Sequence, residues 1–174
     1  MHTLHYFAVQ AEDNQEAFDI VQSRLSSEDG DKFVEWSDWH VVGGGRWSQS
    51  QYEDTSDTVI SYQTDPEGFA KAIADVKRFR IEEMNRYLTE LNYDKLQSDM
   101  VDYISNNGVP SNERFDLNSY YFQKTGKMLM DYYTPDSFFY DLVEYTAHLG
   151  YIQERLSNPD TASKQFLVPV DFHY

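Results

Sequence analysis

The segment from Trp36 to Trp47 constrains the fold of this chain more than any other. It reads W-S-D-W-H-V-V-G-G-G-R-W and holds all three tryptophans of the protein, with three of its eight glycines. Tryptophan carries a large apolar area and one N–H donor, whereas glycine allows positive φ angles and close backbone approach. A segment that concentrates both residue types either forms an irregular packed turn or binds a ligand.

The glycine run has a chemical and a structural interpretation. Gly43–Gly45, followed by Arg46, could cradle an anion with backbone N–H groups. No Gly-Lys-Ser/Thr follows, as a P-loop requires, and no G-x-G-x-x-G pattern opens a helix here. A tight turn flanked by packed tryptophans is therefore favoured. Arg46 would pair with a local acid such as Glu35 or Asp38, or stack on Trp47.

Composition narrows the class of protein. The chain has a net charge of −16, an aromatic content of 16% and no cysteine. The aromatic content argues against disorder, and the lack of cysteine excludes disulfides and thiolate metal sites. No apolar run is long enough to cross a bilayer, and no signal peptide is recognised. We therefore expect a cytoplasmic protein that binds neither nucleic acid directly nor a membrane.

The negative charge is concentrated around the tryptophan segment. Residues 11–67 hold 14 acidic and 3 basic side chains, a net charge of −11. Such a surface is either simply solvated or docks on a basic groove of a partner.

Hydrophobic periodicity and turn residues predict one α+β domain over residues 1–174. Strands are predicted at 3–10, 39–42, 58–64 and 165–174, and helices at 14–26, 66–91, 94–105, 116–124 and 136–156. The terminal strands and the strand at 58–64 would form a small mixed or antiparallel sheet with several helices packed on one face. Pro169 has no N–H to donate, so the last strand is expected at a sheet edge.

The remaining residue patterns suggest no reaction. His173 could approach His2 and His5 if the terminal strands pair, but no metal-binding spacing is present. The many acidic pairs single out no glycosidase site, and no G-x-S-x-G motif is present. We therefore predict no catalytic residue, no metal, no cofactor and no enzyme. Some of the tyrosines and phenylalanines between residues 120 and 140 could line a homodimer or partner surface.

The stretch W-H-V-V-G-G-G-R-W-S resembles small uncharacterised proteins of tailed bacteriophages, in which a strand and a helix precede an aromatic-flanked G-G-R-W turn. The resemblance covers about the first 65 residues. This chain departs from the pattern with a third glycine and with Gln49, where a glycine is common. The family has no established activity, so the resemblance implies no catalytic residue.

Two functions fit these observations. The first is a phage-encoded acidic interaction protein, with a possible homodimer, that inhibits a host antiviral defence system. Its partner would be a basic or nucleic-acid-handling effector protein, with DNA mimicry as one mode of binding. The alternative is a small-ligand or nucleotide-binding module that uses the Trp/Gly loop. The residues expected to bind are Trp36, Trp39, Arg46, Trp47, Asp38, Glu53 and Asp54.

Overall fold

A computed structural model describes residues 2–27, 37–48, 55–108, 116–129, 139–141 and 149–173 of the chain. The chain groups into two compact units: Met1–Ala74 with Tyr133–Tyr174 form unit 1, and Asp75–Tyr132 form unit 2. Helix α3 (Pro66–Glu90) contributes residues to both units. That residues 1–174 act as one domain stays a prediction.

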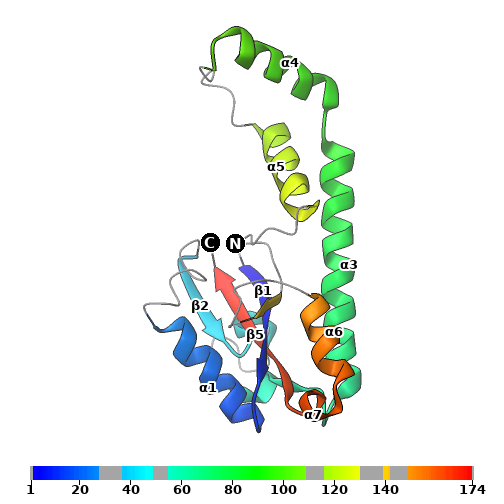
Figure 1. The fold of residues 1–174 in the computed structure, drawn as a ribbon. Helices are drawn as coiled ribbons and strands as arrows, with labels where there is room; N and C mark the ends of the chain where they lie inside the picture. Colours follow the sequence, from blue (N-terminus) through cyan, green and yellow to red (C-terminus); the bar gives the residue numbers. More distant parts are fainter. Residues whose placement is uncertain are drawn as a thin grey trace. The chain divides into compact units, whose positions relative to one another are not determined.

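Unit 1 is built on a mixed sheet in which β5 (Gln165–His173) has the most partners (Figure 1). It pairs antiparallel with β1 (His2–Gln10), β2 (Trp39–Val42) and β3 (Ile60–Ser61). Strand β4 (Phe139–Asp141) pairs with β1 in parallel. The predicted α+β class with a small mixed sheet is confirmed.

Helix α1 (Asn14–Leu25) covers an apolar face of this sheet. The Asp13 side chain caps the helix by accepting a hydrogen bond from the Glu16 backbone N–H at 2.8 Å. The apolar residues of α1 recur at helical spacing, so one side of the helix is buried. The cluster beneath it comprises Ala17, Phe18, Val21 and Leu25 of α1, with Phe7, Val9, Val42, Phe166, Val168, Val170 and Phe172 of the sheet.

Short elements complete unit 1. The 3-10 turn η2 (Gly45–Trp47) follows β2, and the 3-10 turn η3 (Ser56–Thr58) precedes β3. Helices α6 (Leu149–Ser157) and α7 (Pro159–Ala162) precede β5. None of the described helices in either unit is long and apolar enough to cross a membrane.

Unit 2 consists of the later part of α3, α4 (Tyr93–Ser105) and α5 (Leu117–Leu129). Helices α3 and α5 meet through aromatic rings: Tyr87 stacks on Tyr121 with a centroid distance of 5.6 Å and meets the edge of Tyr120 at 6.0 Å. Such ring pairs add stability beyond the area that they bury.

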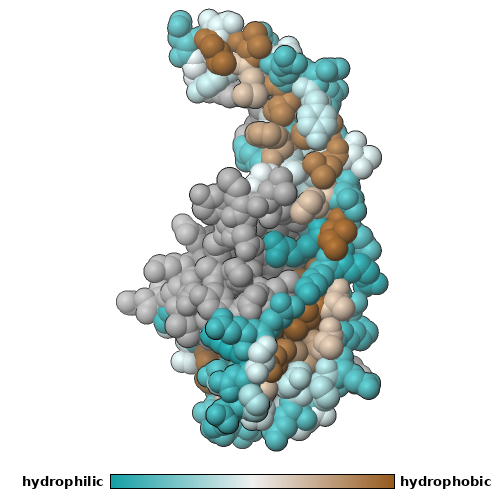
Figure 2. All heavy atoms as spheres, turned by 45° about the vertical axis from the view of Figure 1, so that its right-hand side comes forward, coloured by the Kyte–Doolittle hydropathy of each residue, from teal (hydrophilic) through white to brown (hydrophobic). Residues whose placement is uncertain are grey.

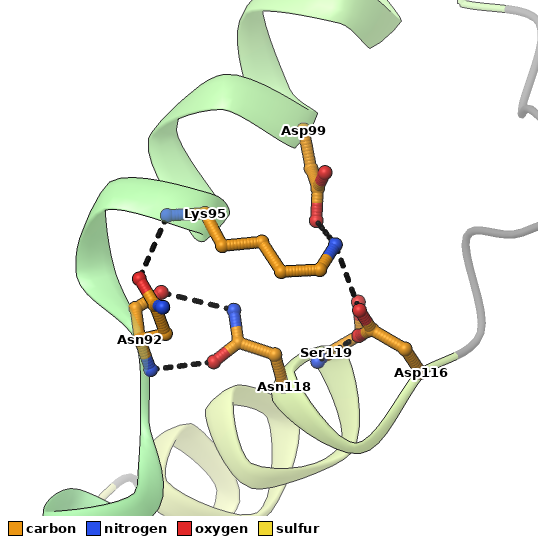
Figure 3. Close-up of polar contacts among 6 residues, drawn as sticks. All are labelled: Asn92, Lys95, Asp99, Asp116, Asn118 and Ser119. Atoms are coloured by element: carbon orange, nitrogen blue, oxygen red, sulfur yellow. Dashed lines mark hydrogen bonds and ion pairs between the residues drawn. The ribbon is translucent and has the colours of Figure 1, made fainter.

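Polar contacts hold the start of α4 against the start of α5 (Figure 3). The Asn118 side chain accepts from the Asn92 N–H at 2.6 Å and donates to the Asn92 carbonyl at 3.0 Å. The Lys95 ammonium lies 2.7 Å from Asp99 and 2.8 Å from Asp116. Hydrogen bonding to Lys95 lowers the pKa of Asp116 to about 2.

The expectation that Pro169 places the last strand at an edge is wrong, because β5 has strands on both sides. The Pro169 carbonyl accepts from the Gly43 N–H at 2.8 Å, so this side of the residue faces the end of β2. Pairing with β2 ends at Val170, and pairing with β3 begins at Leu167. The missing N–H therefore falls between two strands, where no ladder bond is lost.

Three boundaries differ from prediction. The helix predicted at 136–156 is wrong at 139–141, where Phe139–Asp141 forms β4, and is confirmed at α6, Leu149–Ser157. Residues 136–138 and 142–148 of this prediction lie outside the described residues. Aromatic residues suit a strand, and pairing with β1 decides the outcome. Strand β3 starts later than the predicted range of 58–64, because Thr58 is the last residue of a 3-10 turn, and it ends at Ser61. Helix α5 extends beyond residue 124, the predicted end of this helix.

His5 makes the stability of unit 1 depend on pH. This residue of β1 is fully buried opposite Val170, and burial lowers its pKa from 6.5 to about 3. The unfolded chain therefore binds a proton that the folded chain excludes, so stability falls as pH drops below 6.5.

We expect the unfolding free energy to fall by about 2 kcal/mol from pH 7.5 to pH 5, at about 1.4 kcal/mol per unit below the unfolded pKa. Urea unfolding followed by tryptophan fluorescence measures it, since all three tryptophans lie in unit 1. His5→Leu should remove this contribution, whereas the packing control Phe7→Leu should keep the slope. An unchanged slope in His5→Leu would exclude the histidine as its cause.

Candidate functional site

Three strands bring aromatic side chains into one row at the end of the sheet. His173 of β5 pairs with His2 of β1 on one side and with Trp39 of β2 on the other. Directly paired residues of antiparallel strands point to the same face. The approach of His2 and His173 that terminal strand pairing would allow is thus observed.

The rings of this row are in contact. Trp39 stacks on His173 with a centroid distance of 5.1 Å and an interplanar angle of 7°. His2 presents its edge to Trp39 at 5.2 Å, to His173 at 4.9 Å and to Trp47 at 6.1 Å. We call His2, Trp39, Trp47 and His173 the aromatic cluster.

A buried carboxylate supports this cluster. Asp171 has no solvent exposure and lies two residues before His173, on the same face of β5. Its two oxygens lie 3.0 and 3.1 Å from His2 Nδ1, and one accepts the Arg46 backbone N–H at 3.1 Å. A buried carboxylate requires such partners, so Asp171 fixes both the His2 ring and the glycine turn.

The three glycines are required by the shape of the turn. Gly43, Gly44 and Gly45 have φ angles of 93°, 86° and 45°. A Cβ on Gly43 would lie 2.4 Å from the Thr55 carbonyl oxygen, and one on Gly45 would lie 2.6 Å from Asp171 Oδ2. Side chains are thus excluded both by the backbone conformation and by close neighbours.

The glycine turn does bind an anion, but the anion belongs to the chain itself. The N–H of Arg46 meets the carboxylate of Asp171, as described above. The Arg46 guanidinium lies over the Trp47 ring at 5.6 Å, which confirms the predicted stacking. Asp38 lies 3.3 Å from His173 Nδ1, while Glu35 lies outside the described residues.

The cluster presents an accessible aromatic surface. Trp39 is 38% exposed and Trp47 is 48% exposed, whereas the carboxylate behind them is buried. Such a surface can stack on a planar group or attract a cation through the ring faces. No three His, Cys, Asp or Glu residues in the described ranges are grouped as a metal site requires.

The predicted binding residues are only partly assembled. Trp39, Arg46, Trp47 and Asp38 gather at the cluster. The sequence interpretation missed Asp171, although it is the only charged residue in the apolar strand β5. The other expected binding residues, Trp36, Glu53 and Asp54, lie outside the described residues.

Comparisons with protein-family models, curated proteins and solved structures find no match to this chain. The resemblance of the glycine turn to small phage proteins therefore stays a prediction.

Two matched glycine substitutions test the packing of the turn. Gly44→Ala should lower the free energy of unfolding by about 1–2 kcal/mol, the strain of a left-handed conformation. No clash adds to this loss, because the new Cβ would meet Pro169 at an ordinary 3.4 Å. Gly45→Ala should cost about 1–3 kcal/mol more, from overpacking against Asp171. Urea unfolding followed by tryptophan fluorescence measures both, and equal losses would contradict the proposed close contact.

Proposed function

We propose that this chain is an acidic interaction protein whose partner is a protein with a basic surface. The observation that carries the proposal is the division of charge between the units. Unit 1 has 20 acidic and 6 basic residues, whereas unit 2 has 10 acidic and 8 basic residues. The negative field therefore arises almost entirely from unit 1, and a field of one sign steers association with a partner of opposite sign.

Helix α1 presents part of this charge. Asp13, Glu16 and Asp19 are exposed along the helix, with its apolar side buried beneath them. The Ser56 hydroxyl donates to Gln15 at 2.8 Å, which brings η3 and the exposed Asp57 next to this face. Acidic side chains from two elements thus form one surface that can contact a basic groove.

The partner that we propose is a nucleic-acid-handling component of a host antiviral defence system. The acidic surface supports a partner with a basic surface, which the chain would inhibit by competing with the partner's nucleic acid. The resemblance of the glycine turn to phage proteins supports action inside an infected host cell, in its cytoplasm. The proposal assigns no reaction and no cofactor to the chain.

Capture from bacterial lysate at low salt, with the tagged chain, tests this function. A basic protein should bind and be released by salt or by added duplex DNA, because screening and competition both weaken a charge-based contact. Asp19→Lys with Asp57→Lys should weaken capture strongly. The control Asp94→Lys with Asp102→Lys makes the same change of net charge on α4 and should leave capture nearly intact. Equal capture by both variants would contradict the proposal.

A second function is supported by the half-exposed Trp39 and Trp47 beside His2. We propose it as the alternative: a small-ligand site, for which nucleotides are the first ligands to test, because a base can stack on tryptophan and Arg46 carries a positive charge. A nucleotide that binds should quench tryptophan fluorescence, and Arg46→Ala should abolish that quenching. The control Lys164→Ala removes a unit 1 cation that pairs with Glu12 and should have no effect. Quenching that survives Arg46→Ala would contradict the site.

A further inference from the structure

Two exposed tryptophans set the surface of unit 1 apart from that of unit 2. Figure 2 shows hydrophobic residues at the surface of the helices of unit 2. In the part of unit 1 that the structure describes, only Trp39 and Trp47 are large apolar side chains that remain exposed. Both rings contact His2, so the two exposed indoles belong to one surface. Exposed apolar surface marks interaction sites, and tryptophan is enriched among the residues that carry binding energy.

The aromatic cluster lies on the face of the sheet that points away from α1. Successive residues of a strand point to opposite faces, and Phe172 of β5 packs in the core beneath α1. His173 therefore points to the other face, together with its register partners His2 and Trp39. Asp171, two residues before His173, points the same way. The cluster is thus separate from the acidic residues of α1.

Two carboxylates lie beside the rings of the cluster. Asp171 is buried, 3.0 Å from His2 Nδ1. Asp38 directly precedes Trp39, and its backbone N–H donates to the His173 carbonyl at 2.7 Å, which holds Asp38 at the end of the row. The Asp38 side chain is 72% exposed, so its carboxylate can accept hydrogen bonds from a bound group. An exposed indole next to an exposed carboxylate suits a cation, because both attract positive charge.

A contact within the chain indicates which cation binds. The Arg46 guanidinium lies over the Trp47 ring at 5.6 Å. A guanidinium is planar and weakly hydrated, stacks on aromatic rings and offers a carboxylate two N–H groups at once, whereas an ammonium is a strongly hydrated point charge. We propose that the cluster binds an arginine side chain of a protein partner, which stacks against Trp39 and donates to Asp38. We call Trp39 and Asp38 the arginine site.

The arginine site goes beyond the proposed function, because it uses neither α1 nor η3. It shares the aromatic cluster with the nucleotide alternative but takes a ligand of opposite charge. Arg46 has opposite effects in the two cases: it would attract a phosphate, and it would repel an incoming guanidinium. Arg46→Ala should therefore abolish quenching by a nucleotide, but it should keep or tighten the binding of an arginine peptide.

Fluorescence anisotropy of labelled hexa-arginine and hexa-lysine peptides tests the arginine site on the full chain. The two peptides carry the same charge, so the ratio of their dissociation constants, the arginine preference, separates stacking from the general attraction to an acidic chain. Trp39→Leu should lower the arginine preference at least about 3-fold, the loss of an exposed cation–π contact. The control Phe122→Leu removes an exposed ring of unit 2 and should leave the preference unchanged.

Asp38→Asn gives a second variant, at a largely exposed side chain, in case circular dichroism shows that Trp39→Leu misfolds. It should also lower the arginine preference, because an amide cannot replace the charged acceptor. The control Asp94→Asn makes the same change of charge on α4 and should leave the preference unchanged.

Three results would overturn the arginine site: no binding of the arginine peptide at low salt, a preference that survives folded Trp39→Leu or Asp38→Asn, or loss of peptide binding in Arg46→Ala. The acidic-partner function has a separate outcome. Asp19→Lys with Asp57→Lys should weaken lysate capture and the binding of both peptides, with the arginine preference unchanged. Either proposal can therefore fail without the other.

Discussion

Strand β5 is the element on which unit 1 depends, because it hydrogen-bonds to three of the other four strands. β1 comes from the start of the chain, while β2 and β3 follow α1 after long intervals. Each pairing is therefore non-local, and loops must close before these contacts form. The core beneath α1 likewise draws Phe166, Val168, Val170 and Phe172 from this one strand. Loss of β5 would remove both the sheet and the apolar floor of the core.

The same strand carries the buried carboxylate of Asp171, around which the aromatic cluster is organised. Asp171 links the start of the chain, through His2, to the glycine turn, through Arg46. The glycine turn is therefore held by a carboxylate that lies more than a hundred residues later in the chain. This explains why Gly45 must lack a side chain: the space beside its backbone is occupied by the carboxylate.

Sequence patterns predicted the helices and strands that are determined by interactions between residues close together in the chain. The apolar spacing of α1 and α4, and the aromatic residues of strand β1, give the same boundaries in sequence and structure to within a residue or two. Predictions failed where partners far along the chain decide. Pro169 is central because its missing donor faces a gap between β2 and β3, and Phe139–Asp141 is a strand because β1 is beside it. The single charge of Asp171 in an apolar strand indicates a special role for this residue. Its partners, His2 and Arg46, are too far away in the sequence for a motif to predict them.

The pairing of His2 with His173 has a practical consequence for engineering. Both ends of the described chain lie on neighbouring central strands, β1 and β5, at one end of the sheet and next to Trp39. A short linker could join them, so a circular permutant opened in a different loop is geometrically feasible. Conversely, an affinity tag fused at either end would stand beside the aromatic cluster and could mask it.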